Sequence, residues 1–323
     1  MGRQSSIDLD SPDRPFDNII NFRDVGRTIN HFCGSEILKE GVLYRSARPD
    51  DASERDKRRL ADELHIATVI DLRSQTEHQM ATRKRRTELV SAGATSQEAD
   101  LTKIPVPNDP DEHICKIPES QHMFISLTGK SFERALLSRL DWMSYLDLLT
   151  PSPPTINSRV ITLALTGYRT DAVRIIGETV MQPRGLIGLA QDSLESSMSE
   201  LRTIFTTLAT SAAYPVLIHC TQGKDRTGII ILLLLLLVGV RMDAVADDYG
   251  RSELELVPEF EERMREIRVL GLGEEYTRCP PNYVPEMIAF LEKKYGGVKG
   301  YLEKIGIDSV TQELIRQKLM NQV

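Results

Sequence analysis

The stretch VLIHCTQGKDRTGIIILLLLLLV, residues 216–238, decides the fold, because a short and a long apolar run flank a polar centre. The first run predicts a buried strand. The second run, residues 229–238, has ten aliphatic residues. It is too short to cross a membrane, which takes about 20 residues, and predicts a buried helix. One cysteine, three charged residues and two glycines lie between the runs. The stretch therefore predicts a strand–loop–helix unit with a reactive loop.

The spacing within this loop predicts a site for an oxyanion. Five residues separate Cys220 from Arg226. A loop of this length can turn its backbone N–H groups into one concavity, and the N-terminus of the next helix adds positive potential there. Gly223 and Gly228 permit the close approach and unusual backbone angles that such a loop needs. We expect the residues that bind a dianionic group above the cysteine to be Thr221, Gln222, Gly223, Lys224 and Thr227.

The same surroundings favour a nucleophilic thiolate at Cys220. Arg226 carries a planar guanidinium, which suits two oxygens of a phosphate and the equatorial oxygens of a phosphoryl group in transfer. The hydroxyl of Thr227 is expected to donate to the cysteine sulfur. His219 is expected to hydrogen-bond the backbone beside the cysteine and so shape the loop; an ordinary buried histidine is the alternative.

Composition and spacing exclude other kinds of site. A nucleotide-binding loop needs GxxxxGK[ST], but here Lys224 is followed by aspartate. The sequence shows no metal-ligand spacing and its four cysteines form no CxxC pair, so we expect neither a metal nor another cofactor. Few, scattered cysteines suit a reducing compartment, which predicts a cytoplasmic protein. The net charge of −7 argues against a nucleic-acid partner.

Strands that alternate with helices predict an α/β fold with a mostly parallel central sheet flanked by helices. Strands are expected at residues 41–47, 67–74, 102–109 and 214–220. Between them, helices are expected at residues 50–66, where Ser53 is a candidate N-cap, and at 188–209. A helical C-terminal region follows Gly228, with helices expected at 227–239, 242–250, 257–270, 283–295 and 310–320.

The predicted domain organisation is a disordered tail, residues 1–17, and a single domain, residues 18–323. A helical insertion at about 110–185 is expected to interrupt the sheet between the strand near residue 104 and the helix near residue 188. Two interpretations of this insertion are open: a lid over the site, or a peripheral decoration.

The loop HCTQGKDRTG, residues 219–228, resembles the CxxxxxR(S/T) signature of cysteine-dependent phosphatases. It is most similar to the HCxxGKDRTG loop of a bacterial and fungal tyrosine-phosphatase family whose members often also act on phosphoinositides. Further segments resemble that family in the same order: NFRDVG (21–26), LYRSARPDDAS (43–53), VIDLRSQTE (69–77) and YGGVKGYLEKIGID (295–308). The resemblance covers about residues 18–110 and 186–323 and implies a single phosphatase domain of the cysteine-phosphatase type. Six polar residues in these motifs are expected to form buried ion pairs that position the loop, with direct contact to the substrate as the alternative: Asn21, Arg23, Asp24, Arg45, Asp71 and Arg73.

The resemblance also implies a two-step mechanism, in which Cys220 attacks phosphorus and water hydrolyses the resulting phosphocysteine. Both steps need a proton carrier. Asp225, inside the loop, is favoured; Asp109 or Asp111, on a separate loop, is the alternative. In the resembling families a lysine at the position of Lys224 accompanies phosphoinositide activity.

The expected function is therefore that of a phosphomonoester hydrolase acting on phosphotyrosine, phosphoinositides or both. A soluble inositol-polyphosphate phosphatase and a catalytically silent phosphate-binding scaffold are the alternatives. The expected partner is a phosphorylated protein or a phosphoinositide, with transient contact to a membrane surface but no integral membrane segment. For the run RKRR, residues 83–86, a solvated helix face is favoured; contact with acidic lipid headgroups and an import signal are the alternatives.

Overall fold

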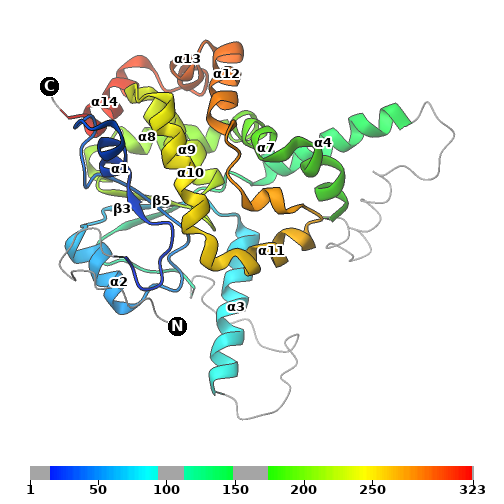
Figure 1. Cartoon of the computed structure of the whole chain (residues 1–323), viewed down its shortest axis with the longest axis horizontal. Coiled ribbons are helices and arrows are strands. Elements are labelled where there is room, and N and C mark those ends of the chain that lie inside the picture. The colour runs from blue at the N-terminus through cyan, green and yellow to red at the C-terminus, as the bar shows by residue number, and fades with distance from the viewer. Residues whose placement is uncertain (1–14, 94–112, 148–173, 322–323) are drawn as a thin grey trace.

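A five-stranded sheet forms the centre of the computed structural model, which describes residues 15–93, 113–147 and 174–321 (Figure 1). The strands lie in the order β1–β2–β5–β3–β4. Their bounds are Arg23–Asp24 (β1), Leu43–Ser46 (β2), Thr68–Asp71 (β3), Gln121–Phe124 (β4) and Val216–His219 (β5). Only β1 is antiparallel to its neighbour among these strands. The predicted α/β class with a mostly parallel sheet is confirmed.

Helices cover both faces of this sheet. In the N-terminal half they are α1 (Val25–Cys33), α2 (Glu54–Arg58), η1 (Arg59–Glu63), α3 (Gln75–Gly93) and α4 (Lys130–Asp147). Before β5 come η2 (Gly177–Met181), α7 (Gln182–Ser196), α8 (Met198–Leu208) and η3 (Ser211–Ala213). The C-terminal part holds α9 (Asp225–Val238), α10 (Met242–Glu255), η4 (Val257–Glu259), α11 (Phe260–Val269), η5 (Glu274–Thr277), α12 (Tyr283–Tyr295), α13 (Val298–Lys304) and α14 (Ser309–Leu319).

The alternation of side chains along β3 and β5 divides the core in two. Ile70 and Ile218 point into a large core shared with α7 to α10 and α12 to α14, whereas Val69 and Leu217 point into a smaller core on the other face, beneath η1. Successive strand residues face opposite sides of a sheet. Because both faces are buried, β5 reads as a continuous apolar run rather than an alternating one.

The aliphatic helix α9 is buried nearly all round, as its sequence predicts. It packs against α7, α10, α13 and α14 behind the sheet, and Gly239, with φ of 83°, ends it in the left-handed conformation. Within the described parts of the chain, no helix combines the length and the apolar character that a membrane crossing demands.

The predicted N-cap of α2 is confirmed, whereas one helix predicted further along the chain is two helices. The Ser53 hydroxyl accepts from the Asp56 N–H at 3.0 Å, and the Asp56 carboxylate accepts from the Ser53 N–H at 3.1 Å, which is a complete capping box. The single helix expected at 188–209 is instead α7 and α8. They are separated at Ser197, whose hydroxyl donates to the Leu127 carbonyl.

The edge strand beside β3 corrects the prediction for the segment 110–185. The strand expected at 102–109 lies outside the described residues. β4 pairs with β3 in parallel, so the sheet continues inside the segment that was expected to interrupt it. Its sequence, QHMF, is short and partly exposed, and therefore carries no apolar signal. Downstream, α4 packs on η2 and α7 through a small core of Phe132, Leu136 and Val180.

Candidate active site

The candidate site lies where three parallel strands end. Ser46, Asp71 and His219, the last residues of β2, β3 and β5, lie side by side in register. Since the carboxyl ends of parallel strands share one edge of a sheet, the loops that follow them meet there. Cys220, directly after β5, therefore lies between the segment that leaves β2 and the segment that leaves β3.

The loop between β5 and α9 closes tightly around Cys220. Gly223 has φ of 65°, and a Cβ atom at this position would lie 2.0 Å from the Ser46 carbonyl oxygen. Only glycine fits both constraints. The Gly223 N–H donates to the Cys220 sulfur at 3.2 Å. Cys220 is 3% exposed and lies at the floor of a pocket.

The carbonyl groups of residues 221–224 are all held by donors that lie outside the loop. The Arg48 N–H donates to the carbonyl of residue 221 at 3.1 Å, and the side-chain amide of Asn21 donates to that of residue 222 at 2.8 Å. Nη2 of Arg45 donates to the last two, at 2.6 and 3.3 Å. Because these carbonyls are engaged elsewhere, the loop can present N–H groups toward an anion.

A buried ion group anchors these donors. Asp248, in α10, accepts from Arg45 Nη1 at 2.5 Å and from Arg23 Nε at 2.8 Å. Arg23 also donates to the Asn21 side chain. Burial alone would raise the pKa of Asp248, but the two guanidinium groups outweigh it and hold that pKa below its ordinary value. The expected buried ion pairing is confirmed here, whereas Asp24 instead caps α1.

Arg226 in α9 pairs with a residue that the sequence analysis did not single out. Its Nη1 and Nη2 atoms donate to the two carboxylate oxygens of Glu77, both at 2.6 Å. The Thr221 hydroxyl also donates to Glu77. Burial would raise the pKa of Glu77, but the charge and hydrogen bonds of Arg226 outweigh it and lower that pKa.

The sequence around Glu77 contains a pattern that predicts a helix N-terminus. Glu77 follows Ser74 by three residues, which is the spacing of a capping box. Ser74 donates from both its N–H and its hydroxyl to one oxygen of Glu77, at 2.9 Å each, and the Glu77 N–H donates back at 3.3 Å. The pattern thus predicts the start of α3, although not the contact with Arg226.

The other two charged loop residues face different surroundings. The side chain of Asp225 is 37% exposed and lines the pocket, where the Tyr249 hydroxyl donates to it at 3.3 Å. Lys224 is fully buried, and its ammonium donates to the carbonyls of Tyr276 and Arg278, at 2.9 and 2.7 Å. Lys224 therefore ties the loop to η5, away from the phosphate-binding position suggested by the sequence.

Three other predicted residues have distinct outcomes. His219 is buried and hydrogen-bonds the Cys220 carbonyl at 3.3 Å, in line with its expected contact to the backbone. The Thr227 hydroxyl is buried but has no hydrogen-bond partner among the described residues, so the expected bond to the cysteine sulfur is not formed. Asp109 and Asp111 lie outside the described residues.

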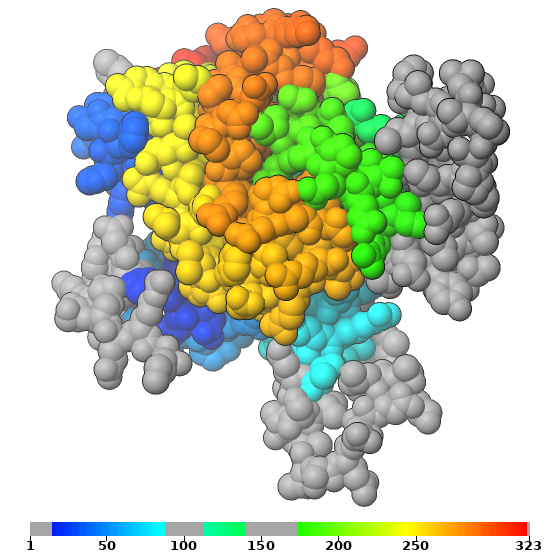
Figure 2. Space-filling view, turned by 45° about the vertical axis from the view of Figure 1, so that its right-hand side comes forward, coloured from blue at the N-terminus to red at the C-terminus, as the bar shows by residue number. Residues whose placement is uncertain are grey.

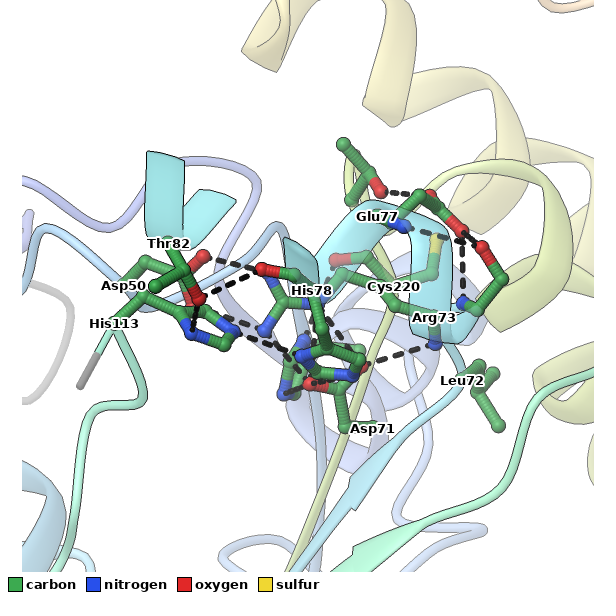
Figure 3. A network of polar contacts seen from close by, with 12 residues as sticks. Asp50, Asp71, Leu72, Arg73, Glu77, His78, Thr82, His113 and Cys220 are labelled. Atoms are coloured by element: carbon green, nitrogen blue, oxygen red, sulfur yellow. Dashed lines mark hydrogen bonds and ion pairs between the residues drawn. The ribbon is translucent and has the colours of Figure 1, made fainter. Parts of the chain in front are cut away.

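A polar network continues from this site along β3 and α3 (Figure 3). Arg73 bridges Asp71 and Asp50, with hydrogen bonds of 2.7 and 2.5 Å. His78, next to Glu77, contacts His113 through ring nitrogens 2.8 Å apart. Burial lowers the pKa of both histidines, which favours neutral rings that share one proton between them.

A pocket of about 270 Å³ opens above the loop. Its floor is formed by Cys220, Thr221, Gln222, Asp225 and Arg226. Its walls are mostly aliphatic or aromatic and come from α4, η2, α7, α11, η5 and the segment between α11 and η5. They comprise the side chains of Phe132, Met181, Leu186, Leu189, Ile267, Leu270, Leu272 and Tyr276. In Figure 2 the green surface of residues 174–196 adjoins the orange surface of residues 260–278, and the Tyr276 hydroxyl of η5 donates to the Met181 carbonyl of η2.

Known proteins are similar to this chain over most of its length. The sequence profile of a tyrosine phosphatase family matches residues 14–321. The triple specificity protein phosphatase PtpB of Mycobacterium tuberculosis is 27% identical over 332 aligned residues, which cover 93% of this chain and 96% of that protein. A tyrosine-protein phosphatase of Nostoc commune is 32% identical over 136 residues, which cover 39% of this chain and 46% of that protein.

Substitution of Gly223 tests the closure of the loop. We expect Gly223→Ala to lower the free energy of unfolding by at least about 2 kcal/mol, because the new Cβ needs a strained φ and meets the Ser46 carbonyl. Chemical denaturation measures the effect. Gly250→Ala in α10 is the control: no atom lies within 4 Å of its added Cβ, so it should be neutral or stabilising by up to about 1 kcal/mol. Equal stability of both variants would contradict this account.

Neutralisation of Asp248 tests the buried ion group. Asp248→Asn should lower stability at pH 7 by about 3 kcal/mol, because two buried arginines lose their shared carboxylate. A carboxyl whose pKa is lowered by folding stabilises the protein above its unfolded pKa of about 3.9, and this stabilisation is lost as the pH falls further.

The difference between wild type and Asp248→Asn should therefore shrink below about pH 4. Denaturation curves measured from neutral to acidic pH check this. Asp247→Asn is the control. Asp247, one residue before Asp248, is more exposed than Asp248 and pairs with Arg251, so its substitution should lower the free energy of unfolding by less than about 1 kcal/mol at every pH. A difference that is the same at every pH would argue against the ion group.

Proposed function

Because the chain belongs to the tyrosine phosphatase family, we propose that it hydrolyses phosphotyrosine through a phosphocysteine intermediate on Cys220. One observation carries the proposal: the cysteine lies at the floor of the pocket, inside a loop whose carbonyls are all engaged elsewhere. The N–H groups of such a loop and the N-terminus of α9 can hold the oxygens of a phosphate directly above the sulfur.

In the proposed first step, the Cys220 thiolate attacks phosphorus, an S–P bond forms and the P–O bond to the phenol breaks. Arg226 stabilises the equatorial oxygens as the phosphoryl group is transferred. Asp225 gives a proton to the leaving phenolic oxygen; its partly exposed carboxyl at the floor of the pocket supports this role.

In the proposed second step, a water molecule attacks the phosphocysteine. Asp225, now ionised, takes a proton from that water as the O–P bond forms and the S–P bond breaks. Inorganic phosphate leaves and the thiolate is regenerated. The cycle needs no oxidant or reductant, and Asp225 begins and ends it protonated.

The walls of the pocket favour an aromatic ester. An aryl ring can be buried against side chains such as Phe132, Leu189 and Ile267 without loss of hydrogen bonds. An inositol ring would instead lose water from its hydroxyl and phosphate groups on entering this pocket. Glu266 also lines the pocket, and its negative charge disfavours a second phosphate.

Phosphoinositides are the second candidate substrates, because the run RKRR lies on α3 beside the site. Within it, Lys84 pairs with Glu262 at 2.7 Å and Arg85 donates to the Asp50 carbonyl at 3.0 Å. Partners within the protein reduce the charge these side chains offer to a membrane. We therefore rank phosphotyrosine first, phosphoinositides second, and soluble inositol polyphosphates and a catalytically silent scaffold below them.

Phosphate release from a panel of substrates tests the function. With phosphotyrosine peptide, phosphoinositide vesicles and soluble inositol phosphates offered in turn, we expect the highest kcat/KM on the phosphotyrosine peptide. Cys220→Ser should lower turnover by more than about 10⁴-fold, since an alcohol at that position is a far weaker nucleophile. Turnover retained by the folded Cys220→Ser protein would exclude the phosphocysteine mechanism, and no turnover by wild type would favour the scaffold.

The proton carrier is tested separately. Asp225→Asn should lower kcat by about 10²-fold or more on an alkyl phosphate, whose leaving group needs protonation. The loss should be smaller on 4-nitrophenyl phosphate, because 4-nitrophenolate leaves without help. Asp243→Asn, an exposed carboxylate paired with Arg241, should leave both rates unchanged. Equal losses on the two substrates would move the acid role away from Asp225 and toward Asp109 or Asp111.

A further inference from the structure

The guanidinium of Arg226 is held from one side. Its Nη1 and Nη2 atoms donate to Glu77. Weaker contacts run from Nη2 to the Thr221 hydroxyl at 3.3 Å, and from Nη1 to the Leu72 carbonyl at 3.4 Å and the Thr128 hydroxyl at 3.5 Å. Among its hydrogen bonds to the described residues, none leaves from Nε. The Nε–Nη2 edge is thus the edge that an oxyanion can approach.

We propose that Glu77 is a positioning residue, which fixes the guanidinium of Arg226 so that its Nε–Nη2 edge meets the equatorial oxygens of the phosphoryl group. The inference rests on the proposed function and adds to it a residue from α3, outside the loop that carries Cys220. A planar guanidinium binds two oxygens only in a defined orientation. A partner that sets this orientation before substrate arrives therefore matters for the rate.

Glu77 is itself held in place by several donors. One carboxylate oxygen accepts from Arg226 Nη2 and the Thr221 hydroxyl; the other accepts from Arg226 Nη1 and from the N–H and hydroxyl of Ser74. The side chain is 27% exposed. Both oxygens are saturated with donors, so the carboxylate cannot turn away without breaking the capping box of α3.

The helix that carries Glu77 is fixed at further points (Figure 3). His78 contacts His113, and the Thr82 hydroxyl contacts the second ring nitrogen of His113, both at 2.8 Å. Two residues after Thr82, Lys84 reaches Glu262 of α11 at 2.7 Å. The first three turns of α3 therefore form a rigid support, and Glu77 transmits its position to Arg226.

These contacts distinguish positioning from blockade. A blocking carboxylate would occupy the edge of Arg226 that faces the phosphate and would have to leave when substrate binds. Glu77 instead takes the opposite, Nη1–Nη2 end of the fork, and an oxyanion at the Nε–Nη2 edge competes only with the 3.3 Å contact to Thr221. Glu77 and a bound phosphate can therefore contact Arg226 together.

The charge balance predicts which kinetic constant responds. Glu77 neutralises the charge of Arg226, so attraction of the substrate dianion depends mainly on the loop N–H groups and the N-terminus of α9. Arg226 then contributes chiefly through its fit to the phosphoryl group in transfer. Loss of Glu77 should lower kcat and leave KM nearly unchanged, because a contact specific to the transition state is affected.

The test compares Glu77→Gln and Glu77→Asp with wild type on 4-nitrophenyl phosphate. We expect Glu77→Gln to lower kcat by about 10²-fold, because its amide N–H groups repel the guanidinium and displace it. Glu77→Asp keeps the charge and should recover a substantial part of kcat. Glu54→Gln is the matched control: it is likewise in the first turn of a helix and ion-paired, to Lys57, and should leave kcat unchanged.

Tungstate titrated by calorimetry gives a second measurement, since this oxyanion binds without turnover. Affinity in Glu77→Gln equal to or below that of wild type supports positioning; tighter binding or a higher kcat would show blockade and overturn the proposal, as would an unchanged kcat. If Glu77→Gln does not fold, Glu77→Ala, which removes the carboxylate without adding an N–H group, takes its place, and an unchanged kcat in Glu77→Ala overturns the proposal. Activity of wild type reports on the proposed function, and the ratio of variants to wild type reports on Glu77.

Discussion

The site depends on the outward orientation of the carbonyl groups of residues 221–224. A loop that turns so tightly has backbone groups of both signs, and it can bind an anion only if its carbonyls are engaged elsewhere. Arg45, Asn21 and the backbone of residue 48 supply those donors. All three precede the loop by more than 170 residues. The pairing of β1 with β2 and of β2 with β5 is therefore a condition for the proposed anion binding, and not only for stability.

This arrangement concentrates positive charge under the loop. Arg23 and Arg45 share the carboxylate of Asp248, and the group as a whole carries one net positive charge in a buried place. Such a charge is costly unless strong acceptors surround it. The loop carbonyls accept part of it through Arg45 Nη2. The same contacts thus offset the burial of the arginine and hold the loop open for an anion.

Local patterns carried most of what the sequence could predict. Features that depend on neighbours in the chain could be predicted without the fold. They are the apolar runs at β2, β3 and β5, the cap at Ser53 and the spacing around Cys220. β4 and Asp248 are different: the first is a polar edge strand, and the second lies on a helix whose contacts with Arg23 and Arg45 arise only on folding. Glu77 lies between these cases, because its spacing from Ser74 predicts a cap and only the fold adds Arg226.

The two basic residues of the loop point in different directions: Arg226 lines the pocket and Lys224 does not. This difference bears on which substrates the pocket favours. Lys224 turns away to the carbonyls of residues 276 and 278. Arg226 is the basic side chain among the described residues that line the pocket, where Glu77, Asp225 and Glu266 are acidic. In the proposed mechanism, affinity for one phosphate then rests on backbone N–H groups, which any phosphate ester satisfies equally. In that mechanism, discrimination between esters comes from the apolar walls of α4, α7 and α11, because they face the part of the substrate that differs.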